Sequence, residues 1–148
     1  MAREKEFAHE FREVFQAKGY SLLLPPTATY ELHVIRAEGE SAAEREWARV
    51  ALLQLTRWGI QPFDLDSTSE AIAEHFARGL LQKKLLPEEE LDDGLILAQT
   101  SLAEIPLLVT SDKHLLDIDG NKLLLAFNEA DLPAVHPVHP KRLLKALR

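Results

Sequence analysis

The sequence predicts a three-layer α/β/α domain built around a mostly parallel sheet. Short apolar segments alternate along the whole chain with amphipathic segments of helical length. Strands separated by helices of this length are joined by right-handed crossovers, which produce a parallel sheet covered on both faces. A length of 148 residues is usual for one hydrophobic core, so we expect a single domain over residues 1–148.

Four short apolar segments are the predicted strands, at residues 21–24, 60–65, 106–110 and 135–138. The first of them, SLLL, ends at a Pro-Pro pair, which stops a strand before a helix. The third, PLLVT, has the uninterrupted apolar run of a strand buried on both faces. These features favour a parallel sheet over a half-exposed antiparallel one.

Helical periodicity fills the intervals between these strands. In residues 3–18 the apolar positions recur at three- and four-residue spacing, and Gly19 ends the segment. The segment 91–102 is apolar on nearly every side, so we expect it to lie buried against the sheet. Further helices are expected after Pro25-Pro26, around Trp47–Trp58, after Asp66 or Ser67, over 120–130 and over 140–147.

Composition excludes several classes of protein. The chain has no cysteine, which excludes disulfides, thiol nucleophiles and cysteine zinc sites and agrees with a cytoplasmic location. No apolar run approaches the ~20 residues that cross a bilayer, and the charged N-terminus is not a secretory signal, so we expect no membrane association.

The charge of the chain limits how it can contact nucleic acid. A net charge of −7 argues against bulk attraction to phosphates, so any such contact must be local and metal-assisted or use small basic patches. The basic clusters are Lys83-Lys84 and, in the last predicted helix, Lys141, Arg142, Lys145 and Arg148. These clusters are candidates for substrate contacts, although solvated helix faces explain them equally well.

Three carboxylates stand where the predicted fold would gather them at one edge of the sheet. Glu31 lies about one turn into the helix after the first strand, Asp93 opens the buried helix, and Asp112 follows the strand that ends at Thr110. Ligands collect beyond the carboxyl ends of parallel strands, because loops and helix N-termini converge there. Three carboxylates without a cation would repel, whereas Mg²⁺ or Mn²⁺ accepts oxygen ligands. The order of the three residues therefore predicts a metal site for phosphodiester hydrolysis.

Each of these residues also has a structural explanation. Glu31 fits a solvated helix carboxylate, and Asp112 fits a turn residue that bonds its own backbone. Asp93 fits a helix N-cap, and so does Asp92. Adjacent helix positions point about 100° apart, so Asp92 and Asp93 do not both face one metal ion.

The stretches LLLPPTATYEL, LDDGLILAQTSL and LLVTSDKHLL, with the closing VHPVHPKRLLKAL, resemble the PIN domain nucleases. The resemblance implies that Glu31, Asp93 and Asp112 are metal ligands and that Thr110 or Ser111 supports the site through a hydroxyl. It also implies a Mg²⁺- or Mn²⁺-dependent ribonuclease with an RNA substrate. Many members are toxins neutralised by an antitoxin encoded beside them, so we expect an antitoxin partner, and we expect a homodimer.

The chain departs from this family at its beginning. Members usually open with a central strand that ends in an aspartate followed by Thr or Ser and Asn, whereas this chain opens in a predicted helix. We therefore expect that the recorded start lies downstream of the true one, and that the site without this aspartate is impaired. The alternative from another class is a noncatalytic PIN-like module that binds a partner protein.

Overall fold

The computed structural model describes residues 10, 13–15, 17–19, 22–57 and 59–147. The chain folds into two compact units, each with its own set of packed elements. Unit 1 comprises Met1–Phe63 with Leu144–Arg148, and unit 2 comprises Asp64–Leu143. The single domain expected over residues 1–148 stays a prediction.

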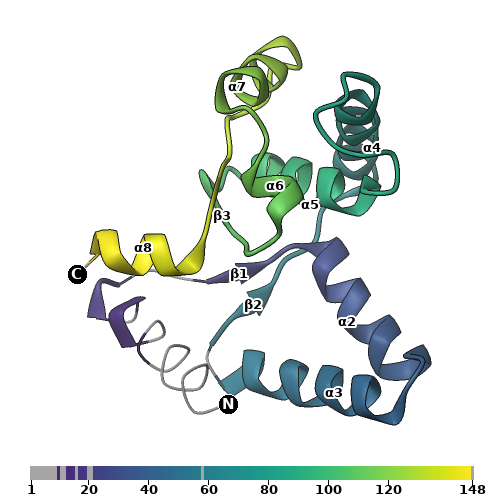
Figure 1. The fold of residues 1–148 in the computed structure, drawn as a ribbon, viewed down its shortest axis with the longest axis vertical. Helices are drawn as coiled ribbons and strands as arrows, with labels where there is room; N and C mark the ends of the chain where they lie inside the picture. Colours follow the sequence, from purple (N-terminus) through teal and green to yellow (C-terminus); the bar gives the residue numbers. More distant parts are fainter. Residues whose placement is uncertain (1–9, 11–12, 16, 20–21, 58, 148) are drawn as a thin grey trace. The chain divides into compact units, whose positions relative to one another are not determined.

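Unit 1 contains a parallel strand pair connected through two helices (Figure 1). The pairing aligns Leu23 with Gln61 and is held by hydrogen bonds that flank the short strands, such as Phe63 N–H to Leu24 O at 3.0 Å. Proline at the start of the first helix suits a position that needs no backbone donor. The elements are β1 (Leu23–Leu24), α2 (Pro26–Glu38), α3 (Ala42–Arg57) and β2 (Gln61–Pro62).

Unit 2 contains a second parallel strand pair and most of the remaining helices. Its register runs from Leu107 opposite His136 to Val109 opposite Val138. The elements are α4 (Ser67–Gln82), α5 (Leu91–Leu102), β3 (Leu107–Val109), α6 (Lys113–Leu116), α7 (Gly120–Glu129) and β4 (His136–Val138). The chain then enters α8 (Pro140–Leu147), a continuous helix that begins in unit 2.

The core of unit 2 is built on the packing of α4 against α5. A Cβ at Gly94 would lie 3.0 Å from the Ala77 Cβ, so the glycine allows the two helices to approach closely. Phe76 stacks on Phe127 from α7 with ring centroids 4.7 Å apart. Leu97 is fully buried at the centre of the same cluster. This packing fixes the position of the first turn of α5, where the acidic residues of the candidate site lie.

The structure confirms a mixed α/β protein with short parallel strands. The strands are shorter than predicted, and the four-residue helix α6 was not predicted. Parts of the predicted segments 3–18 and 21–24, together with Trp58, lie outside the described residues. In α3, Trp47 and Val50 face solvent and are 61% and 41% exposed. Among the residues with described positions, no helix combines the length and apolar character needed to span a bilayer.

Candidate metal site

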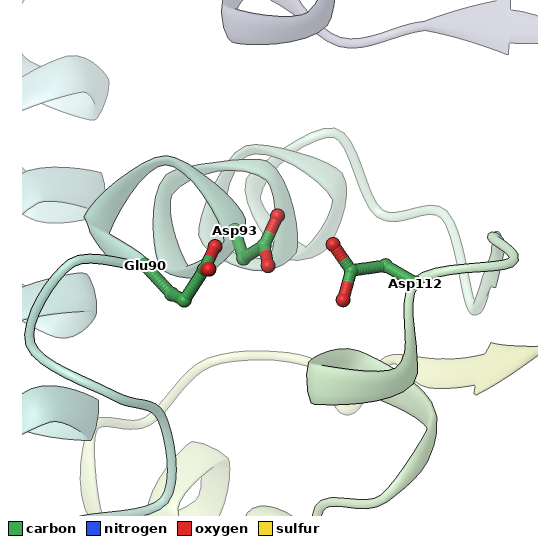
Figure 2. Close-up of side chains that lie close together, drawn as sticks. All are labelled: Glu90, Asp93 and Asp112. Atoms are coloured by element: carbon green, nitrogen blue, oxygen red, sulfur yellow. The ribbon is translucent and has the colours of Figure 1, made fainter.

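Three carboxylates of unit 2 converge in a group that we name the acidic cluster: Glu90, Asp93 and Asp112. One carboxylate oxygen from each lies within 4.8 Å of the others, and all three side chains are half-buried. Figure 2 shows Asp93 between the other two, with the carboxylates directed toward one another. The cluster therefore offers oxygen ligands from two separate segments of the chain.

The start of α5 supplies two of these carboxylates. Glu90 is the residue before the helix and Asp93 lies in its first turn. Residues three apart on a helix lie on the same side, which brings the two side chains together. The Glu90 side chain makes no capping hydrogen bond, while its carbonyl accepts from Gly94 N–H at 3.3 Å. The Glu90 carboxylate is thus turned toward the cluster and not toward the helix backbone.

The end of β3 supplies the third carboxylate. Asp112 is the N-cap of α6, and its Oδ1 accepts from His114 N–H at 2.8 Å. The Asp112 N–H donates to Thr110 Oγ1 at 3.1 Å, and the Thr110 N–H donates to Val138 O of β4 at 3.0 Å. These bonds fix the backbone of Asp112 relative to the sheet. A carboxylate has about four acceptor sites, so the capping bond leaves Asp112 able to bind a cation.

The His114 side chain links the two segments. Its Nε2 lies 3.5 Å from Glu90 Oε1, while its backbone donates to Asp112. The imidazole is about half exposed, so its pairing with Glu90 is screened by solvent. His114 therefore lies at the rim of the acidic cluster.

The electrostatics of the cluster are unfavourable without a cation. Asp93 Oδ2 is buried and has no hydrogen-bond partner among the described residues. Burial, as the largest cause, together with the negative charges and hydrogen bonds of Asp112 and Glu90, raises the pKa of Asp93 from 3.8 to about 7. A divalent ion at this position would give the orphan oxygen a partner and neutralise the repulsion. Three carboxylates are the donor set that suits Mg²⁺ or Mn²⁺.

The structure brings together two of the three sequence-predicted ligands and adds one that was missed. Asp93 and Asp112 meet in the cluster, and Glu90, which is not among the predicted ligands, joins them. The three-residue spacing of Glu90 and Asp93 is the signal that could have identified it. The alternative of Asp93 as an N-cap is wrong, because the N-cap position belongs to Glu90. Asp92, its neighbour, is exposed and outside the cluster.

The other predicted site residues have separate positions. Glu31 lies half-buried on α2 in unit 1 and is not a member of the acidic cluster, so its role as a ligand stays a prediction. Thr110 positions Asp112 through its hydroxyl, as described above. Ser111 is exposed. The alternative of Asp112 bonding its own turn is observed, and it coexists with membership of the cluster.

Comparisons with known proteins give this chain no relative. No family model matches it, and no curated protein or solved structure matches it. The resemblance to PIN domains therefore depends on the sequence motifs alone, and a functional assignment has to be built on the acidic cluster.

Proposed function

We propose that this chain is a Mg²⁺- or Mn²⁺-dependent ribonuclease of PIN type that hydrolyses RNA phosphodiester bonds. The observation that supports the proposal is the convergence of three carboxylate oxygens within 4.8 Å of one another, in a cluster where Asp93 Oδ2 is buried and has no hydrogen-bond partner among the described residues. Glu90, Asp93 and Asp112 would hold the ion. When bound, such an ion lowers the pKa of a water molecule and neutralises charge on a phosphate oxygen.

The residues of the chain have distinct roles in this proposal. Thr110 and the N-terminus of α6 hold Asp112 in place, and the first turn of α5 holds Glu90 and Asp93. Asp93 must lose its proton before it can bind a cation, and its pKa of about 7 places that loss near neutral pH. Metal affinity should therefore fall as the pH falls below about 7.

The resemblance extends the proposal beyond the cluster. It includes the three-layer α/β/α arrangement, Glu31 as a further ligand, reduced activity without the first aspartate, and a cytoplasmic toxin that pairs with an antitoxin and forms a homodimer. The four sequence motifs that resemble PIN domains support these elements. These further elements of the proposal are implied by the resemblance to the family, whereas the geometry of the acidic cluster does not bear on them.

Calorimetry with Mn²⁺ tests the site directly. We expect binding heat from the wild-type protein and none from Asp93→Asn, because the variant lacks the central ligand. Asp92→Asn is the matched control, since Asp92 is exposed on the same helical turn and lies outside the cluster. The heat should also decrease as the pH falls from about 8 to about 6, as the raised pKa of Asp93 requires.

Cleavage of RNA tests the activity. With Mn²⁺ present, we expect Asp112→Asn to abolish cleavage and Asp117→Asn, a change at the exposed C-cap of the same short helix, to leave it intact. Cleavage that persists at full rate after Asp112→Asn removes the cluster from consideration as the active site. A wild-type protein that gives neither Mn²⁺ heat nor cleavage would instead support the noncatalytic binding module.

A further inference from the structure

The hairpin of α2 and α3 carries a groove that we name the α2–α3 groove, with an exposed tryptophan in its wall (Figure 1). The groove has a volume of about 710 Å³, and all of its lining residues belong to unit 1. Val34 and Ile35 of α2 and Ala43 and Trp47 of α3 form its apolar lining. Trp47 is 61% exposed, so the largest apolar side chain of the groove is accessible to a partner.

The apolar surface of the groove continues along both helices. Tyr30 lies four positions before Val34, and Val50 lies three positions after Trp47, so each pair shares one side of its helix. Tyr30 is 70% exposed and Val50 is 41% exposed. Exposed apolar side chains that adjoin one another are typical of protein interfaces, and tryptophan and tyrosine are enriched among the residues that dominate binding.

Three glutamates give the groove a negative charge. Glu38, Glu40 and Glu44 line it, and no basic residue is among the described residues that do so. These carboxylates form no ion pair within the described ranges. The Arg45 side chain donates to the Gly39 carbonyl at 2.6 Å and leaves the glutamates unpaired. Their charge is therefore available to a cationic partner.

The turn between the helices holds the acidic end of the groove in one conformation. Glu44 N–H donates to Ser41 Oγ at 3.1 Å, and Glu40 N–H donates to Glu44 Oε2 at 3.1 Å. A Cβ at Gly39 would lie 2.6 Å from the Ile35 carbonyl oxygen, so the tight turn requires glycine. A groove that is formed in advance spends less binding free energy on ordering itself.

The negative charge of the groove decides which class of partner fits. RNA and membrane surfaces are themselves anionic, so the glutamates repel them. A second copy of the chain has a net charge of −7, and a symmetric contact through this surface would place the same glutamates opposite one another. A protein segment with both apolar and basic side chains complements the two features of the groove.

The walls of the groove decide the conformation of that segment. Both walls are helices, and helical backbone groups are bonded within the helix, so the partner has to bind through side chains. An amphipathic helix does this by laying its apolar face into a groove, with contacts at i, i+3, i+4 and i+7.

We propose that the α2–α3 groove binds a basic amphipathic helix of a partner protein. The apolar face of that helix packs against Trp47 and Val34, and its lysine or arginine side chains pair with Glu38 and Glu40. This inference does not rest on the proposed function, because the groove belongs to unit 1 and the acidic cluster belongs to unit 2.

Fluorescence anisotropy with a labelled model peptide in EDTA tests the proposal. The probe has about 18 residues, all leucine or lysine, with leucine at i, i+3, i+4 and i+7, which is long enough for an isolated helix. We expect Trp47→Ala to weaken binding about 30-fold, the loss typical of an aromatic residue that dominates an interface. We expect Glu38→Gln/Glu40→Gln to weaken binding about fivefold at about 0.1 M salt, and much less at about 1 M salt.

Matched controls separate the groove from general stickiness and from net charge. Leu53→Ala changes a 51% exposed residue of α3 that lies about 120° around the helix from Trp47, so affinity should stay within about twofold. Glu88→Gln/Glu89→Gln removes the same two charges at exposed positions outside the lining of the groove and should also change affinity by less than about twofold. A peptide with the lysines replaced by glutamates should not bind. Unchanged far-UV circular dichroism confirms that the variants fold.

Several results would overturn the proposal. They are no binding of the peptide by the wild type, equal losses in Trp47→Ala and Leu53→Ala, equal losses in the two glutamate variants, and equal binding of a scrambled peptide of the same composition. Sedimentation that shows a dimer which Trp47→Ala dissociates would assign the groove to a second copy instead. Peptide binding in EDTA without Mn²⁺-dependent cleavage would support the groove and contradict the nuclease proposal, and the reverse result would do the opposite.

Discussion

Replacing Asp93 by asparagine should stabilise the metal-free protein while removing its proposed function. Asp93 Oδ2 is buried without a hydrogen-bond partner in the described ranges, and burial, followed by the charges of Asp112 and Glu90, raises the pKa of Asp93 from 3.8 to about 7. Asparagine has nearly the same shape, carries no charge and offers an N–H donor to the neighbouring carboxylates. The substitution therefore removes the repulsion and keeps the packing.

The magnitude follows from the two pKa values. A change from 3.8 in the unfolded chain to about 7 in the folded protein corresponds to about 4 kcal/mol, at about 1.4 kcal/mol per pH unit. Asp93 is only half-buried, so solvent screening reduces this penalty to about 2 kcal/mol. In a chain of this size, the same free energy raises the melting temperature by about 4–8 °C.

The sign of the pH dependence is fixed by the direction of the shift. Because the folded protein holds the Asp93 proton more tightly than the unfolded chain does, its contribution to stability is full below pH 3.8 and is lost as the pH rises to about 7. The stability advantage of Asp93→Asn should thus be near zero at about pH 4 and should reach its full value at about pH 8. Carboxylates that do not interact with Asp93 contribute alike in both proteins and cancel in the difference.

Thermal unfolding of the wild type, Asp93→Asn and Asp92→Asn in EDTA provides the measurement. The Asp92 variant should unfold like the wild type, because Asp92 is exposed. Added Mn²⁺ should raise the melting temperature of the wild type and leave that of Asp93→Asn unchanged, since a ligand that binds only the folded state stabilises it. An Asp93→Asn protein that is less stable than the wild type at about pH 8 in EDTA would refute the reasoning.

Two further predictions concern the supports of the site. Gly94→Ala should destabilise by about 1–3 kcal/mol in urea, because the new Cβ would lie 3.0 Å from the Ala77 Cβ, whereas the control Gly79→Ala, which meets nothing within 4 Å, should stabilise by up to about 1 kcal/mol. The same sign for both variants would contradict the helix packing. Thr110→Val should cost about 1 kcal/mol and weaken Mn²⁺ binding, because Asp112 N–H loses its acceptor. Ser111→Ala, at an exposed position, should change neither quantity.

The sequence was sufficient for the longer helices and for the parallel character of the strands. In α4 the buried residues Ala73, Phe76, Ala77 and Leu80 follow helical spacing, and such spacing is visible in one segment alone. Strand ends depend on hydrogen bonds to a partner strand, so the observed strand, Leu107–Val109, is shorter than the predicted segment 106–110. Helix α6 has only four residues, too few for a periodic pattern.

The sequence predicted two of the three residues of the acidic cluster. Asp93 and Asp112 each follow a recognisable local signal, a helix start and a strand end. Glu90 joins them only because the loop before α5 turns its carboxylate away from the backbone, with φ −104° and ψ 38° and no capping bond. The sequence around Glu90 does not show that conformation. A long-range contact of this kind needs the structure.

Hydrogen-bond capping of the helices does not explain the negative charges of the acidic cluster. The Glu90 side chain occupies a cap position without capping, and Asp93 buries an oxygen that has no hydrogen-bond partner in the part of the chain that the structure describes. Only Asp112 caps a helix, and serine, threonine or asparagine would cap it about as well without adding charge. A neutral residue at any of the three positions would relieve the repulsion that raises the pKa of Asp93. The three carboxylates thus make the metal-free protein less stable than the same fold with a neutral residue at one of these positions. A bound cation would offset that loss of stability.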